Sequence, residues 1–231
     1  MIGELRESQL HEALKLHYAE ACGGLTEQQV EGLVVDVLAP EEIIEIQTAN
    51  FSGLRNKLTR LLEKGYRVRV VHPIAASKRI RLVAADGTTV VRERNSPQSR
   101  GYSHAALELM RIPDLIGHPG LSVELVLVSI LEERIDDGSG SWRRNGVAIR
   151  GRELLEIGEM LVLDSIESYT LLLPANLPPL FTHRELAGQG GLSIGQATKL
   201  SWLLRRIGIL ETAGKRGRAM LLQLTSRKEP L

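Results

Sequence analysis

One stretch, residues 34–48, constrains the fold more than any other part of the chain; its sequence is VVDVLAPEEIIEIQT. Two short apolar runs flank an acidic turn, which predicts two strands joined as a hairpin. Each run carries one carboxylate among Val, Leu and Ile residues, Asp36 in the first run and Glu45 in the second. A charge inside an apolar strand is costly to desolvate, so both side chains need a partner or a function.

The spacing of the second run places its polar residues together. Successive side chains of a strand alternate between the two faces of the sheet, so Glu45 and Gln47 share a face while Ile44 and Ile46 point into a core. If the two strands pair as a hairpin, Asp36 lies opposite this Glu/Gln pair. Two converging carboxylates suit a hard divalent cation, Mg²⁺ or Mn²⁺. The alternative is that both acids are ordinary polar residues on the open face of a half-buried sheet.

Asp36 and the triplet Glu45-Ile46-Gln47 resemble the acidic motif of the PD-(D/E)xK superfamily, the restriction-endonuclease-like nucleases. In that family an Asp is followed on the next strand by Glu-x-Lys and then by a helix. Here Gln47 stands where the Lys usually is, a variant that also occurs among restriction enzymes, and Val35 precedes the Asp in place of Pro. The resemblance covers roughly the first third of the chain and implies that Asp36 and Glu45 are metal ligands at a catalytic site.

The resemblance also assigns roles to two further residues. Superfamily nucleases often add a Glu from the first helix to the metal site. Glu7 fits this role better than Glu12, because it lies roughly 20° around the helix from Leu14 and flanks the core-facing stripe. Gln47 can position the attacking water through hydrogen bonds but cannot supply a positive charge. We expect His11 and His72 to be packed and hydrogen-bonded histidines, since this is the commoner fate of a lone His beside an apolar face.

The order of the predicted elements fits the same fold. Apolar spacing predicts a helix over 4–21, strands over 29–38 and 42–48, a helix over 51–64 and a strand over 66–71. The sequence therefore predicts an α/β protein with a mixed sheet flanked by helices, and the resemblance makes that sheet restriction-endonuclease-like. Further along, Asp86-Gly87 predicts a hairpin turn, residues 104–110 a short helix, and residues 123–130 an apolar strand. The segment 150–163 gives a mixed pattern.

The last part of the chain has a different character. Pro174, Pro178 and Pro179 mark a boundary, and Thr182 and Ser193 can cap two successive helices. A Gly-rich basic hairpin follows around residues 213–217. Helix, turn, longer helix and basic hairpin resemble a winged helix-turn-helix domain over about the last 50 residues. We therefore divide the chain into a nuclease-like core (1–100), an elaboration, clamp or dimer segment (101–176) and a winged helix (177–231).

Charge is distributed unevenly along the chain. Residues 1–64 hold 6 Lys/Arg against 11 Asp/Glu, whereas residues 181–231 hold 9 against 3. A basic end suits phosphate binding, although winged helices also serve as dimerisation or protein-docking modules. The residues expected to contact nucleic acid lie on the second helix and the hairpin of this region: Gln196, Lys199, Arg205, Arg206, Lys215, Arg216 and Arg218.

Composition excludes several other classes. The chain has 231 residues, is 43% hydrophobic, and has a single cysteine, Cys22, so it can build a core but no disulfide framework. No apolar run approaches a membrane span, and the N-terminus does not read as a signal peptide. We expect a cytoplasmic protein with no membrane association, and a homodimer from the resemblance alone.

These observations predict an Mg²⁺-dependent endonuclease that hydrolyses phosphodiester bonds of DNA and is anchored on its substrate by a basic winged helix. RNA remains a possible substrate, because the metal chemistry is the same. The alternative is a catalytically inactive nuclease-fold protein with a DNA-binding or regulatory role, which the missing Lys keeps open.

Overall fold

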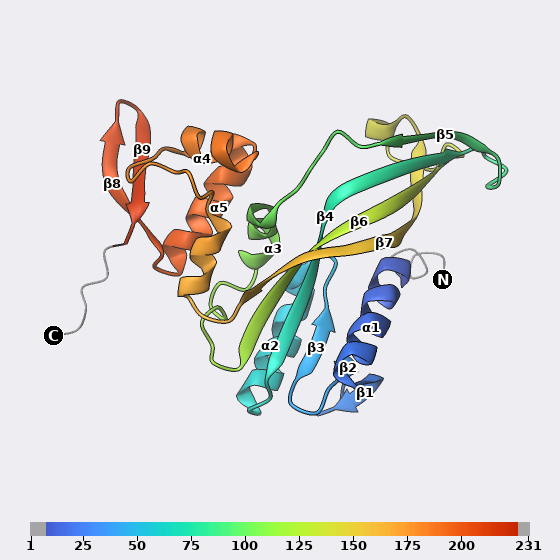
Figure 1. The fold of residues 1–231 in the computed structure, drawn as a ribbon, viewed down its shortest axis with the longest axis horizontal. Helices are drawn as coiled ribbons and strands as arrows, with labels where there is room; N and C mark the ends of the chain where they lie inside the picture. Colours follow the sequence, from blue (N-terminus) through green and yellow to red (C-terminus); the bar gives the residue numbers. More distant parts are fainter. Residues whose placement is uncertain (1–7, 226–231) are drawn as a thin grey trace. The chain divides into compact units, whose positions relative to one another are not determined.

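The computed structural model describes residues 8–225 and is a mixed α/β structure with helices flanking a mixed sheet (Figure 1). Its first part contains, in order, α1 (Ser8–Cys22), β1 (Leu25–Val30), β2 (Leu33–Leu38), β3 (Ile43–Ile46), α2 (Phe51–Glu63) and β4 (Val68–Val83). There follow β5 (Val90–Asn95), the short helices η2 (Tyr102–Ala105) and α3 (Ala106–Leu109), β6 (Leu121–Asp136), η3 (Trp142–Arg144), β7 (Val147–Leu163) and η4 (Glu167–Leu172). The chain continues with α4 (His183–Gly190), α5 (Ile194–Arg206), β8 (Leu210–Arg216) and β9 (Ala219–Leu224).

The chain divides into two compact units, each assembled from three segments. The first unit comprises Met1–Thr48, Val71–Arg100 and Val126–Met160. The second unit comprises Ala49–Val70, Gly101–Leu125 and Leu161–Leu231. β4, β6 and β7 each contribute residues to both units, so the boundaries between units cross the long strands.

Within residues 8–225 the main sheet has the strand order β1-β2-β3-β4-β6-β7, and β5 pairs with β4. β1, β2 and β3 form an antiparallel meander. β3 and β4 are joined through α2 and run in the same direction in Figure 1, which makes the sheet mixed. The predicted succession of helix, strands, helix and strand is therefore confirmed, with β1 and β2 separated at Gly32, whose φ is 72°.

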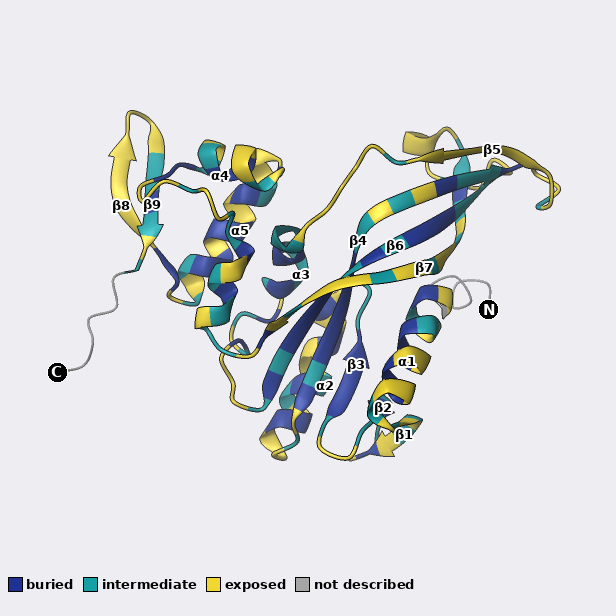
Figure 2. Ribbon diagram, viewed as in Figure 1, coloured by how far each residue is buried: buried dark blue, intermediate teal, exposed yellow. Residues whose placement is uncertain are grey.

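The core of the first unit lies between α1 and the sheet. Leu10, Leu14 and Tyr18 of α1 pack against buried strand residues that include Ile44 and Ile46. The prediction that these two isoleucines face a core is confirmed, and β3 is buried along its whole length (Figure 2). The apolar stripe of α1 is thus covered by the meander, which fixes the helix beside the strand that carries Asp36.

β4 is much longer than the predicted strand over 66–71, and it continues through Pro73. Gln47 donates its N–H to the Val71 carbonyl at 2.8 Å, so the backbone groups of Val71 point toward β3, and those of Pro73, two residues on, point to the same side. β3 ends at Ile46, and β5 begins to pair with β4 only at Arg79. Along the described chain Pro73 therefore faces an open stretch of edge, where a missing donor costs nothing.

The mixed pattern over residues 150–163 belongs to β7, a strand of 17 residues. β7 is the last strand in the order of the main sheet, and its residues are mostly exposed or half-buried. An edge strand needs no continuous apolar run, because one of its sides and part of its faces meet water. This is why the hydrophobic pattern gave no clear strand there.

In the second unit, the helix starts predicted at Thr182 and Ser193 are confirmed. Thr182 accepts the N–H of Glu185, and Ser193 accepts that of Gln196, so each forms a capping box at the start of α4 and α5. α5 packs against α4 and α3. β8 and β9 pair as an antiparallel hairpin, and Phe181 forms an isolated bridge with Leu222 of β9.

Candidate functional site

β2 and β3 carry the two acidic strand residues, and the backbone pairing of the two strands stops just before them. The register pairs Val37 with Ile44 and Leu38 with Ile43 and goes no further in the described part of the chain. Glu45 is 3% exposed, and Asp36 is half-buried. The two strands are therefore neighbours as predicted, and the placement of Asp36 opposite Glu45 stays a prediction.

The Asp36 carboxylate has two described partners. Its Oδ2 accepts the backbone N–H of Ile46 at 2.7 Å, beyond the point where backbone pairing of β2 with β3 stops. The same oxygen lies 3.2 Å from Nε2 of His11 on α1. The side chain thus replaces a ladder hydrogen bond and ties the first helix to the hairpin.

The prediction that His11 is a packed and hydrogen-bonded histidine is confirmed, and its partner is Asp36. The hydrogen bond to Asp36 raises the pKa of His11 above its ordinary value of 6.5, although burial of the ring acts in the opposite direction. A signal was present in the sequence, since His11 lies between Leu10 and Leu14 on the flank of the stripe that α1 buries. What the sequence could not supply was which strand that flank faces.

Both backbone groups of Gln47, the N–H and the C=O, are hydrogen-bonded to residues of β4. Its N–H donates to Val71, and its carbonyl oxygen accepts a hydrogen bond of 2.7 Å from Nδ1 of the buried His72. Because a carbonyl can only accept, His72 carries a proton on Nδ1. The backbone position of Gln47, directly after Glu45-Ile46, is therefore fixed, while its side chain remains half-buried.

A third acidic ligand is not found in the described part of the chain. Glu7 lies outside the described residues, and within residues 8–225 no three His, Cys, Asp or Glu side chains form a group that could hold a metal. Glu12, the acid that fitted this role less well than Glu7, pairs with Lys15 at 2.5 Å. Asp36 and Glu45 remain as two hard oxygen donors, which fits Mg²⁺, an ion that binds through one or two carboxylates and keeps several waters.

The residues of α5 that were predicted to contact nucleic acid differ in their exposure and in their partners. Lys199 is exposed, whereas Arg206 is exposed but paired with Asp114 at 3.1 Å. Arg205 is half-buried close to His183; burial first, and then the charge of Arg205, lower the pKa of that histidine. The side-chain oxygen of Gln196 accepts hydrogen bonds from Ser193 in the capping box, which leaves its amide NH₂ group for other contacts.

On the hairpin, Lys215 and Arg218 are exposed and form no ion pair with any residue in 8–225. Arg216, which lies between them in the sequence, donates to Glu185 of α4 at 2.8 Å. Hydrogen bonds from Thr182, reinforced by that of Arg216, lower the pKa of the Glu185 carboxyl. Arg216 thus connects the hairpin to the start of α4, whereas Lys215 and Arg218 are exposed to solvent.

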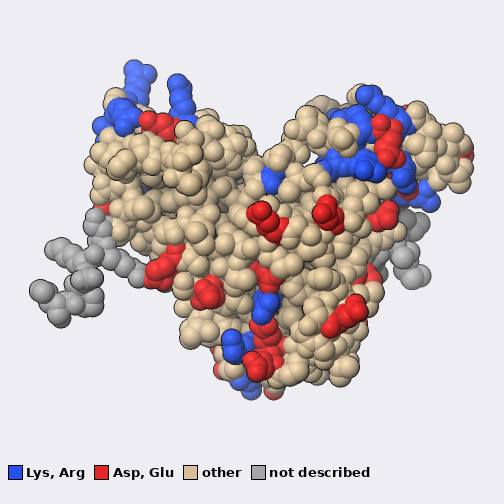
Figure 3. All heavy atoms as spheres, viewed as in Figure 1, with Lys and Arg blue, Asp and Glu red and all other residues tan. Residues whose placement is uncertain are grey.

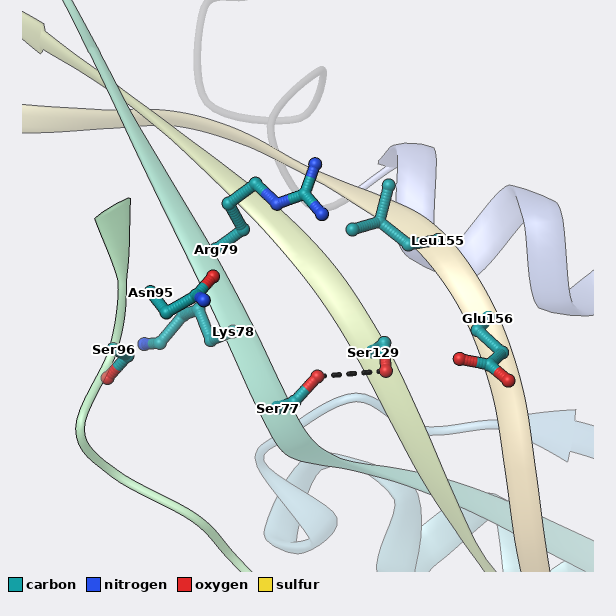
Figure 4. A pocket seen from close by; sticks show the side chains of 8 residues that line it. All are labelled: Ser77, Lys78, Arg79, Asn95, Ser96, Ser129, Leu155 and Glu156. Atoms are coloured by element: carbon teal, nitrogen blue, oxygen red, sulfur yellow. Dashed lines mark hydrogen bonds between the residues drawn. The ribbon is translucent and has the colours of Figure 1, made fainter. Parts of the chain in front are cut away.

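The sequence did not indicate a polar cavity of about 550 Å³ in the first unit (Figure 4). Figure 4 shows its side chains coming from β4, β5, β6 and β7, with Ser77 donating to Ser129 at 2.8 Å across two neighbouring strands. The residues that line it are Ser77, Lys78, Arg79, Asn95, Ser96, Ser129, Leu155 and Glu156. The cavity depends on which strands neighbour one another, and this could not be read from local patterns.

The fold defines the chain as a mixed α/β protein with one acid on each of two neighbouring strands, β2 and β3, and a basic C-terminal hairpin. A family model described as "Domain of unknown function (DUF8091)" matches residues 8–164, and the chain belongs to this family. An uncharacterized protein of Treponema pallidum (strain Nichols) is 32% identical over 231 residues, which cover 99% of this chain and 88% of the relative. No solved structure matches the chain significantly. No helix among residues 8–225 is long and apolar enough to cross a membrane.

The contact between His11 and Asp36 can be tested by titration. In metal-free protein, NMR titration should give His11 a pKa above 6.5, and the substitution Asp36→Asn should return it toward that value. Because the folded pKa is raised, the contact stabilises the fold fully below about pH 6.5 and loses this effect as the pH rises through the folded pKa. His183, whose pKa is lowered, serves as the internal control. An unchanged His11 pKa in the variant would contradict the contact.

Proposed function

We propose that this protein is a metal-dependent nuclease that hydrolyses phosphodiester bonds of DNA. The observation that carries the proposal is the position of the two acids on the fold: Asp36 on the second strand and Glu45 on the third, two strands that pair as neighbours. The order α1, β1, β2, β3, α2, β4 is the order that the resemblance to restriction-endonuclease-like enzymes implies. The same resemblance assigns metal binding to these two acids.

In this proposal Asp36 and Glu45 would hold Mg²⁺ or Mn²⁺, with Glu7 assisting. When bound, such an ion would supply an activated water and neutralise charge on the phosphate. Gln47 orients the attacking water through its side-chain amide, and its backbone, fixed by Val71 and His72, limits how far that amide can move. His11 orients the Asp36 carboxylate by donating from Nε2.

The C-terminal region is the proposed DNA anchor. α4, α5 and the β8–β9 hairpin, with Phe181 bridging to β9, support a winged helix-turn-helix arrangement. In that docking mode a helix enters the major groove and the hairpin contacts flanking phosphates. The exposed charges of Lys199, Lys215 and Arg218 suit these contacts, with Gln196 near the start of α5.

A second candidate, a nuclease-fold protein that binds or regulates DNA without cleaving it, is favoured by one residue. Gln47 occupies the position where a Lys would supply positive charge, and an amide cannot replace that charge. In this reading the basic hairpin still binds DNA, while Asp36 serves only to tie α1 to β3 through His11 and Ile46. The two candidates differ in whether the acids are needed for a chemical step.

Cleavage assays with isosteric variants separate the candidates. Asp36→Asn and Glu45→Gln keep size and hydrogen bonding but remove one negative charge each, so they should weaken Mn²⁺ binding by at least roughly 100-fold and abolish cleavage of plasmid and single-stranded DNA. Glu41→Gln, an equal charge change at an exposed residue of the same hairpin turn, should leave both unchanged. DNA binding without cleavage in the wild type, insensitive to all three substitutions, would establish the second candidate.

The anchor is tested by salt dependence. The double substitution Lys215→Ala/Arg218→Ala should weaken duplex DNA binding and lower the slope of log K against log salt by about 2, because each phosphate contact contributes roughly 0.9. The control Lys64→Ala/Arg111→Ala removes the same charge from exposed residues on other elements of the second unit. Equal slopes for the two double variants would show that the hairpin is not the anchor.

A further inference from the structure

One end of the first unit concentrates arginine. We call this end the arm and define it as residues 77–100 and 130–152, which hold ten Arg and one Lys against six Asp and Glu. The net charge of the whole chain is +1, so the remainder is negative and the arm carries an excess of five positive charges. Figure 3 shows Lys and Arg side chains gathered over this end of β4, β5 and β7.

About half of these cations form ion pairs with carboxylates of the arm. The carboxylate of Glu132, which is 1% exposed, accepts from Arg134 at 2.6 Å and Arg152 at 3.2 Å and lies 3.3 Å from Lys78. On the paired strands β4 and β5, Glu93 lies within 2.9 Å of Arg81 and 3.5 Å of Arg79. Except for the pair of Arg134 and Glu132, which both lie on β6, these ion pairs join neighbouring strands, and the five cations share two carboxylates.

A second group of arginines in the arm forms no ion pairs among the described residues. All five are exposed: Arg92, Arg94, Arg100, Arg143 and Arg144. The arm uses arginine rather than lysine almost throughout. A guanidinium binds phosphate through two parallel hydrogen bonds and stacks on flat rings, which an ammonium cannot do.

Trp142 lies on η3 beside two of these arginines and is 82% exposed. The guanidinium carbon of Arg143 lies 5.4 Å from its ring centroid. The turn beneath it is closed by a hydrogen bond from Gly140 to Gly146, and a Cβ at Gly140 would lie 2.0 Å from the Val147 carbonyl oxygen, so only glycine fits. A large aromatic ring is thus held in solvent on a closely packed turn, which is typical of a binding residue.

The β4–β5 turn and the adjoining part of β7 contact each other at the end of the arm. Arg150 of β7 donates to the Gly87 carbonyl in the β4–β5 turn at 2.5 Å, and a Cβ at Gly87 would lie 3.9 Å from Ile135 of β6. The cavity of Figure 4 is lined partly by the arm, with Arg79 and the Ser77 hydroxyl in its wall, and partly by residues outside it that include Glu156. Its volume of about 550 Å³ is in the range of small-ligand sites, and its polar wall suits the hydroxyls of a sugar group.

We propose that the arm binds single-stranded nucleic acid, with Trp142 stacking on an unpaired base and the five exposed arginines contacting phosphates. Stacking on an aromatic ring combined with a basic surface is how proteins bind single strands without reading their sequence. A base in a duplex has both faces covered, so this ring selects unpaired segments. The inference rests on the proposed function only in taking nucleic acid as the ligand, and it does not involve Asp36 or Glu45.

The two tryptophans of the chain allow a direct test. In Trp202→Phe, Trp142 is the sole tryptophan; in EDTA, adding a thymidine oligonucleotide of about 16 nucleotides should quench its fluorescence, and added salt should reverse the quenching. In Trp142→Phe, the remaining Trp202 of α5 reports on the C-terminal region. In the otherwise wild-type chain, Arg143→Ser/Arg144→Ser should weaken oligonucleotide binding roughly tenfold, whereas Lys64→Ser/Arg111→Ser should not.

Three results would overturn the inference: no quenching of Trp142, binding of a matched duplex as tight as binding of the single strand, or a response of Trp142 to anionic phospholipid vesicles but not to oligonucleotides. Because Trp142 is almost fully exposed, its substitution leaves the core intact, and circular dichroism verifies folding. The measurement is made without metal, and Asp36→Asn should bind the oligonucleotide as the wild type does. A failed nuclease proposal therefore leaves this result unaffected, and the reverse also holds.

Discussion

The register of β2 against β3 is the constraint on which the candidate site depends. Val37 pairs with Ile44, and both are buried beneath α1 together with Ile46. Since side chains alternate along a strand, a slip of one residue would exchange the buried and polar sets, so the apolar core fixes the register. With that register Asp36 and Glu45 lie directly beside the last paired residues of their strands. The position of these two costly charges is thus a consequence of hydrophobic packing, and His11 and the Ile46 N–H stabilise Asp36.

Acidic and basic side chains are concentrated in different parts of the molecule. Asp36 is half-buried and Glu45 is buried in the first unit, while cations are exposed on the arm and on the β8–β9 hairpin. A near-neutral total conceals this separation. Paired and unpaired arginines also have different consequences, since the pairs around Glu132 and Glu93 hold strands together and the remaining ones keep an uncompensated charge. In the proposed function the exposed cations would bind a polyanion, and the two acids would hold a metal ion.

Local chemistry in the sequence predicted much of the fold. The caps at Thr182 and Ser193, the Asp86-Gly87 turn and the order of the first six elements depend on neighbouring residues, and all are found. Features set by distant strands were missed. β4 passes through Pro73 because β3 has already ended there. The bond between His11 and Asp36 joins residues 25 apart, and the arm forms only where β4 to β7 come together. A local sequence pattern does not specify contacts between residues that are far apart in the chain.

The most direct test of the account is a crystal structure of the protein soaked in Mn²⁺, with the ion located by its anomalous scattering. The account predicts one Mn²⁺ with oxygens of both Asp36 and Glu45 at roughly 2.0–2.6 Å. Asp36 would then share its carboxylate between the ion and the helix that carries His11. Absence of Mn²⁺ from this position at saturating concentration, with Asp36 still bonded to His11 and Glu45 directed elsewhere, would contradict it.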